Sequence, residues 1–315
     1  MKTTNAASSA GPDDAHRRVT NRRMSPLQRQ QWSRRLPLLP ALLFTVVVTQ
    51  FPFLLTVWYS VHEWDFLKPH SFKFNGLRNF SKPLQDPFFR EAALNTLITT
   101  VGTVIIATIN GTFLAVLLDK KFFGQGFIRT LLITPFLIMP VAASLIWRHG
   151  FLDATYGFVN WILESLGFGR TGFTSKHALF SVVLVLVWQW TPFIMLIILS
   201  GLQSQTQEVI EAARVDGANA FAVFRRITIP HLRPYLELGA LLGSIYLLQT
   251  FDTVAQLVGG APDARNIPYF IYQRSIGGGW KFGSSSAFGV VVVIATIIIA
   301  NVTLRLISSL LEGEK

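Results

Sequence analysis

Residues able to do chemistry are sparse in this 315-residue chain, and they form no catalytic signature. There is no cysteine, which excludes a thiol nucleophile, a disulfide and a zinc–thiolate site. The six histidines are scattered, without a pair at ligand spacing on one predicted helix. P-loop, serine-hydrolase and zinc-peptidase motifs are absent, and GFGRTG at 167–172 lies between two apolar runs rather than between a strand and a helix. The pattern favours transport over catalysis.

The first candidates for substrate contact are polar side chains inside apolar segments, where a polar group needs a cavity or a partner. Gln249, Asp252 and Gln256 are spaced i, i+3 and i+7, so one continuous helix would place them on one face, suited to the hydroxyls of a sugar. The sequence also allows Asp252 to lie in water at the outer end of its segment, or to pair with Arg265 or Arg274.

Gln189 is the next candidate because Trp188 and Trp190 flank it. A ring face packs on the C–H face of a sugar or polyol, while an amide binds hydroxyl groups. The alternative places both tryptophans in the aromatic belt at the membrane surface.

The segment 205–233 is patterned as a helix followed by a glycine turn. Val209, Ala212 and Ala213 recur at helical spacing, and Gly217 is expected to end this helix. The segment is long and half apolar, unlike an ordinary turn between two membrane helices.

A second short helix is expected after the turn. Phe221, Phe224 and Ile227 recur every three residues, and Pro230 is expected to end the helix. Two short helices joined by a glycine would make a compact projection on one face of the membrane.

The elements that must position these residues are predicted membrane spans. Half of the residues are hydrophobic and 14% are charged, against about 25% charged in soluble domains; mean hydropathy is +0.42. Six runs are apolar enough to cross about 30 Å of hydrocarbon. They are 36–62, 92–118, 130–147, 177–207, 238–260 and 282–304. The fold class predicted is therefore an all-α integral membrane protein with six transmembrane helices.

The placement of Lys and Arg predicts that the N- and C-termini are both cytoplasmic. The net charge of +11 is spread over the loops, with its dense cluster just before the first apolar run, which indicates attraction to membrane lipid and no binding of nucleic acid. Three regions are expected. They are a basic, disordered cytoplasmic tail (1–36), the first transmembrane helix with a periplasmic loop (37–92), and a transmembrane core (93–312) that contains the segment 205–233.

Small residues and prolines predict where the helices touch and bend. Small residues spaced every four positions favour close helix contacts. They are Thr103, Ala107, Gly111 and Ala115 in the second run and Gly239 and Gly243 in the fifth. Pro135, Pro140 and Pro192 are positioned to kink the third and fourth runs.

The segment 205–233 resembles the EAA loop of ABC importer permeases, whose pattern is EAA-x3-G-x9-I-x-L-P. Here Glu211-Ala212-Ala213 is followed at the same spacing by Gly217 and by Ile227-Thr228-Ile229-Pro230, and Ile229 in place of Leu is the one departure. The resemblance runs over about 37–312. It is closest to permeases of maltose-type sugar importers in GLRNF (76–80), the block 122–141 and GGAP (259–262), and to the polyol (sorbitol/mannitol) branch in 129–141 and 188–203.

The resemblance implies the type I ABC importer permease fold and a division of labour. The chain would form half of a translocation pathway in the bacterial inner membrane with a second homologous permease. Two ATP-binding subunits, which hold ATP and Mg, would bind the EAA loops, and an extracytoplasmic solute-binding protein would deliver a sugar or polyol. This chain would carry no cofactor and catalyse no reaction. The implied ATPase-coupling residues are Glu211, Ala212, Ala213, Asp216, Gly217, Ile227 and Pro230.

Other functions predict different residues. A secondary transporter predicts charged pairs at the midplane and inverted repeats, whereas this chain has one peripheral aspartate and no visible repeat. A membrane-embedded enzyme predicts a His/Asp/Glu cluster at one depth. An interfacial amphipathic hairpin without a partner would explain 205–233 without any coupling role.

Overall fold

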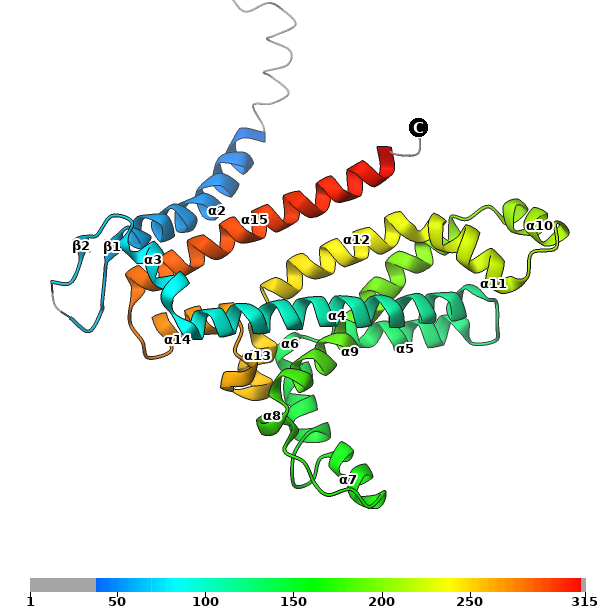
Figure 1. The fold of residues 1–315 in the computed structure, drawn as a ribbon, viewed down its shortest axis with the longest axis horizontal. Helices are drawn as coiled ribbons and strands as arrows, with labels where there is room; N and C mark the ends of the chain where they lie inside the picture. The colour runs from blue at the N-terminus through cyan, green and yellow to red at the C-terminus, as the bar shows by residue number, and fades with distance from the viewer. Residues whose placement is uncertain (1–37, 69, 313–315) are drawn as a thin grey trace, which may run out of the picture. The chain divides into compact units, whose positions relative to one another are not determined.

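The computed structural model describes residues 38–68 and 70–312, and these are mostly helical (Figure 1). They divide into two compact units, one ending at Leu54 and one beginning at Leu55. The helix α2 (Leu39–Ser60) contains the boundary between the units. The predicted basic tail, 1–36, lies outside the described residues.

A small aromatic hairpin follows α2 in the second unit. β1 (His62–Glu63) pairs antiparallel with β2 (Lys73–Phe74). The His62 ring stacks on Phe72 with 4.6 Å between centroids, so ring packing holds together a hairpin with very few backbone hydrogen bonds. The short helix α3 (Arg78–Gln85) leads from the hairpin to the second long helix.

The core of the second unit is a layer of three long helices in which α9 is the most buried. α9 (Ala178–Gln203) packs on α4 (Pro87–Asp119) and on α12 (Ile229–Leu248). α4 begins at Pro87, so the predicted region boundary at 92/93 falls inside this helix.

The small residues lie at these helix contacts, as predicted from their spacing. Thr103, Ala107, Gly111 and Ala115 are all buried on α4. A Cβ on Gly111 would lie 3.0 Å from the backbone nitrogen of Met195, which is closer than side chains normally approach. Glycine therefore sets the separation of α4 and α9.

Two of the predicted membrane segments are broken rather than straight. α5 (Gln125–Leu137) is followed by α6 (Pro140–Leu145) and the π-helix η3 (Ile146–Phe151) after a bend of 94°. Pro140 starts α6, where its missing N–H costs nothing, so the kink predicted in the third run is confirmed. α13 (Asp252–Val258) follows α12 after a bend of 60°.

The remaining elements connect these helices. Arg274 in α14 ion-pairs with Asp86, the N-cap residue of α4, at 2.7 Å, and this pair joins distant segments at the predicted outer side. The connecting elements are α7 (Phe158–Ser165), α8 (Phe173–Lys176), α10 (Gln207–Val215), α11 (Ala220–Val223), the π-helix η4 (Phe224–Thr228), the 3₁₀-helix η5 (Pro262–Ala264) and α14 (Ile267–Ser275). The long helix α15 (Phe282–Glu312) follows them.

Within the described residues the six predicted apolar runs lie mostly on helices, but the number of spans stays a prediction. In this part of the chain α2, α4 and α9 are each long and apolar enough to cross a membrane, and the count is up to five if each bent pair is one span. The sixth run begins α15, where a shorter apolar stretch covers Phe282–Ile298.

The Gly111 contact gives a first testable prediction. Gly111→Ala should lower the thermal unfolding midpoint of the purified permease by an amount equivalent to about 1–3 kcal/mol, because the added methyl group forces α4 and α9 apart. Gly102→Ala on the same helix is the matched control, since its Cβ would lie 3.9 Å from the nearest atom, a side-chain carbon of Val183. Equal midpoints for the two variants would contradict the role given to Gly111.

Candidate functional site

The predicted EAA loop, residues 205–233, folds as α10, a glycine turn and α11, and we call it the coupling loop. Gly217 adopts φ +83°, a left-handed conformation that glycine takes without strain. The N–H of Ala218 donates to the Ala213 carbonyl at 2.9 Å and the N–H of Gly217 to that of Arg214 at 3.1 Å. This is the Schellman arrangement that ends a helix, so the predicted end of the helix at Gly217 is confirmed.

The predicted end of the second helix at Pro230 is wrong. α11, η4 and α12 follow one another without a gap, and Pro230 lies in the first turn of α12. The π-helical turn just before it shifts the hydrogen-bond pattern, and a residue near the start of a helix needs no N–H donor. The second half of the coupling loop is therefore a direct extension of the membrane helix α12.

The structure places the motif residues on an open surface. Glu211, Ala212, Asp216, Gly217 and Pro230 are exposed, and Ala213 and Ile227 are partly buried. α10 has no buried residue, and its exposed side chains include the apolar Val209 and Val215. In Figure 1, α10 and α11 project past the ends of α4, α5 and α12. An exposed helix of mixed apolar and charged character has the properties of a docking element.

The base of the coupling loop is fixed by residues that the sequence did not single out. The Ser204 hydroxyl lies 3.2 Å from His231 Nε2 and 3.0 Å from the Tyr235 hydroxyl. Gly201 lets the Tyr235 ring approach closely, because a Cβ there would lie 2.6 Å from the ring. His231 and Tyr235 are spaced i, i+4 on α12, which is the signal that could have revealed a shared face.

A second contact at the base is buried. The Thr228 hydroxyl donates to Gln205 Oε1 at 3.3 Å. Together with the Ser204 contacts, this bond joins the end of α9 to the start of α12, so a displacement of the coupling loop would be passed directly to both helices.

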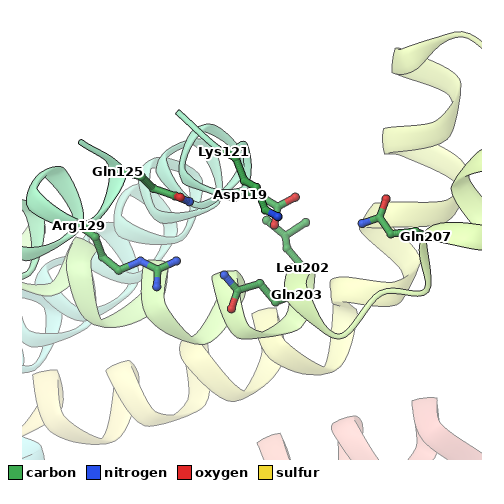
Figure 2. Close-up of a pocket in the computed structure, with 8 residues that line it drawn as sticks. Asp119, Lys121, Gln125, Arg129, Leu202, Gln203 and Gln207 are labelled. Carbon is green, nitrogen blue, oxygen red and sulfur yellow. The ribbon is translucent and has the colours of Figure 1, made fainter. Parts of the chain in front are cut away.

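A polar hollow of about 440 Å³ lies beside the coupling loop, between the ends of α4, α5 and α9. Figure 2 shows Arg129 and Gln203 extending toward the same space, with Gln207 at the start of α10 on its far side. The lining side chains carry both signs of charge, because Asp119 and Lys121 also belong to it. Such a lining is suited to contacts with a polar protein surface rather than with an apolar chain.

Gln189 is buried and already has a partner within the chain. Its Nε2 donates to the backbone carbonyl of Ile138 at 3.0 Å, at the break between α5 and α6. In a continuous helix a backbone N–H would donate to that carbonyl. The bend removes this donor, and the glutamine amide takes its place. Gln189 thus stabilises the broken helix, and a substrate role for it stays a prediction.

The predicted shared face of Gln249, Asp252 and Gln256 is wrong, because the helix is interrupted. Gln249 is the C-cap of α12, and Asp252 begins α13. The buried amide of Asn266 donates to the carbonyl of Thr250 and so stabilises the interruption. Local sequence patterns do not reveal this bond, because its partners are sixteen residues apart.

Asp252 itself is exposed at the start of α13. It forms no ion pair within residues 38–68 and 70–312, since Arg274 pairs with Asp86 and the Arg265 guanidinium lies over the Phe88 ring at 5.9 Å. The sequence left open an ion pair of Asp252 with Arg265 or Arg274, and the structure shows neither pair. Gln249 is exposed too, and Gln256 is partly buried.

The tryptophans beside Gln189 lie in different surroundings. Trp188 lines a largely apolar hollow of about 600 Å³ between α4, α5 and α9, edge to face with Trp147 at 5.6 Å. Asn110 and Thr191 add hydrogen-bonding groups to the same hollow. Trp190 instead contacts Phe136 and Tyr246. Ring faces combined with a few polar groups suit a carbohydrate, and the sequence did not predict this grouping.

No group of three or more His, Cys, Asp or Glu residues able to hold a metal occurs in the described part of the chain.

Comparison with known proteins identifies the family. Residues 111–313 match the family described as binding-protein-dependent transport system inner membrane component. The probable ABC transporter permease protein y4oQ of Sinorhizobium fredii is 36% identical over 241 residues, which are 76% of this chain and 78% of that protein. The trehalose/maltose transport system permease protein MalF of Thermococcus litoralis is 33% identical over 229 residues, 72% of this chain and 77% of that protein.

A solved structure agrees in fold. A chain of a bacterial ABC transporter that imports the acidic polysaccharide alginate superposes with a TM-score of 0.76, covering 89% of this chain and 96% of that chain at 20% identity. The fold is that of a type I ABC importer permease. The chain belongs to the family of inner membrane components of binding-protein-dependent transport systems. It is a non-catalytic permease subunit of an ABC importer, located in the inner membrane.

The Gln189 contact gives a second prediction. Gln189→Leu should lower the thermal unfolding midpoint by the equivalent of about 1–3 kcal/mol, because a carbonyl at the α5–α6 break loses its donor. Gln249→Leu is the control, since Gln249 is exposed and bonds only the Ile245 carbonyl one turn back. If Gln189→Leu unfolds at the same temperature as this control, the stabilising role is refuted.

Proposed function

We propose that this permease imports a carbohydrate or a sugar alcohol. We further propose that the coupling loop transmits ATP-driven motion of the ATP-binding subunits to the membrane helices of the permease. The observation that carries the proposal is the exposed α10–Gly217–α11 unit, which bears the EAA pattern and continues directly into α12. Relatives named for trehalose/maltose and for sulfoquinovosyl glycerol support a carbohydrate. The polyol branch rests on the resemblance in 129–141 and 188–203.

The proposed assembly contains two permeases, two ATP-binding subunits and a solute-binding protein outside the membrane. ATP and Mg are bound by the ATP-binding subunits, and this chain contributes no ligand to them. The exposed face of α10 docks in a groove of an ATP-binding subunit, with Glu211 as the polar contact and Ala212 and Ala213 allowing close approach. Asp216 and Gly217 form the turn, and Ile227 and Pro230 join it to α12.

Six spans with both termini in the cytoplasm complete the proposal. This topology places the coupling loop inside and α7, α13 and α14 outside. A secondary transporter is not favoured. Such a protein binds no separate ATP-binding subunit, so it would not need an exposed docking loop joined to two core helices.

The coupling role predicts the effect of a charge reversal. Glu211→Lys should abolish co-purification of the ATP-binding subunits and uptake, while the permease still inserts, because Glu211 is exposed and makes no ion pair in the described residues. Glu208→Lys, on the same exposed helix but outside the motif, should retain both. Normal co-purification and uptake in Glu211→Lys, or an equal loss in Glu208→Lys, would contradict the assignment.

The predicted pathway residues give a test of substrate contact. Asp252→Asn should change the uptake KM, or the order of preference among sugars and polyols, at least threefold, with unchanged abundance, because the exposed carboxylate has no ion-pair partner to leave behind. Asp263→Asn, an exposed acid on the neighbouring η5, should leave uptake unchanged. Unaltered kinetics in Asp252→Asn for every substrate would remove Asp252 from the pathway.

A further inference from the structure

The segment 152–177 forms an excursion between η3 and α9, and several of its apolar side chains are exposed. The centre of this segment is α7, which projects from the helical core in Figure 1. Val159 packs against the hydrophobic core, and the buried Asn160 faces the same way. Phe158, Trp161 and Ile162 lie on the other side and are exposed. One face of α7 is therefore anchored on the core, and the other face is largely exposed.

The excursion is braced by its own hydrogen bonds. Asn160 Nδ2 donates to the carbonyls of Asp153 and Thr171 at 2.8 and 3.0 Å, and the Thr171 N–H donates to Asn160 Oδ1 at 2.8 Å. The N–H groups of Thr155 and Tyr156 donate to Asp153 Oδ1, and the first of these bonds lowers the pKa of Asp153 below its ordinary value. These hydrogen bonds order the segment, so the exposed apolar side chains have defined positions.

We propose that the outward face of α7 lies in the outer headgroup region of the lipid bilayer and anchors this side of the permease to the membrane surface. The position of the segment in the chain supports this placement. The excursion is joined at both ends to apolar membrane segments, with exposed apolar side chains on each side of it, Ile146 in η3 and Phe180 in α9. The exposed face of α7 thus belongs to a segment flanked in the chain by membrane helices that themselves carry exposed apolar side chains.

The composition of the face gives a second support. The exposed side chains combine aromatic and aliphatic groups with a cation at the end of the segment, Lys176, which can reach lipid phosphates. Trp, Tyr and Phe beside Lys and Arg are typical of segments at the membrane interface. The exposed apolar side chains are Tyr156, Phe158, Trp161, Ile162, Leu166 and Phe168.

The polar groups of the segment are largely satisfied within the chain. The N–H groups of Leu166, Gly167 and Phe168 all bond carbonyls of α7, and Glu164 ion-pairs with Arg170 at 2.8 Å. Satisfied backbone groups lower the cost of moving this segment from bulk water into the bilayer interface, where less water is available to bond them. Lipid is therefore the occupant that fits this face.

The natural absence of cysteine allows a direct test with single reporters. Trp161→Cys places a reporter on the proposed lipid face, and Glu164→Cys is the matched control on the same helix. Within the chain alone the two positions are comparably exposed, 62% for Trp161 and 55% for the Glu164 side chain, so a difference must come from the surroundings. Each variant is labelled with bimane in the complete importer, with cysteine-free partner subunits, in phosphatidylcholine–phosphatidylglycerol vesicles.

The expected result is opposite quenching at the two positions. Headgroup-level nitroxide lipid should quench the label at 161 at least threefold more than at 164, and external iodide should show the reverse order. Equal iodide quenching at both positions would overturn the proposal by placing the face in water. Shielding at 161 from both quenchers would assign the face to another permease, and shielding from iodide only after the binding protein is added would assign it to that protein.

A second reporter protects the test against a local disturbance at Trp161. Phe168→Cys, 63% exposed beyond the end of α7, should behave like 161. Iodide quenching of this label as strong as at 164 would also overturn the proposal. The quenching pattern does not depend on which substrate the importer carries or on the coupling role of Glu211, so its failure is distinguishable from failure of the proposed function.

Discussion

The close packing of α9 against α4 and α12 is the contact on which the rest of the permease depends. Small residues on α4 allow this approach, and Gly111 meets the backbone of α9 directly. α9 then positions the functional parts along its length. It begins where the excursion around α7 ends, carries Gln189 and Trp188 at mid-length, and ends at the base of the coupling loop. Because protein interiors are densely packed, a push at one end of such a helix is transmitted rather than absorbed.

The broken helices follow from the same packing. Irregular backbone at membrane depth is tolerated only where protein or a water-filled cavity satisfies its polar groups. Here the carbonyls at the two breaks are bonded by side chains from other segments, Ile138 by Gln189 and Thr250 by Asn266. Both breaks lie near the residues proposed for substrate contact. At the second break the exposed side chains of Gln249 and Asp252 can bind hydroxyl groups, while the backbone carbonyl of Thr250 between them is satisfied.

Two exposed helices with apolar side chains are given different partners for physical reasons. α10 mixes apolar residues with Glu211 and Arg214, and it lies beside a hollow lined by charges of both signs, which suits a protein surface. The outward face of α7 presents Phe158, Trp161 and Ile162, and the segment satisfies its own hydrogen bonds, which suits lipid. The chemistry of the uncovered face, rather than its exposure alone, indicates the partner.

The sequence by itself determined the apolar segments, the coupling-loop motif, its Gly217 turn and the small-residue contacts, because each depends on spacing within one segment. Only the tertiary structure decided that the helix continues through Pro230, that Gln249 and Asp252 are separated by a break, and that Arg274 pairs with Asp86. It also brought Ser204 to His231 and Trp188 to Trp147. These features depend on partners distant in sequence, and local periodicity carries no information about which distant group will supply a missing hydrogen bond or charge.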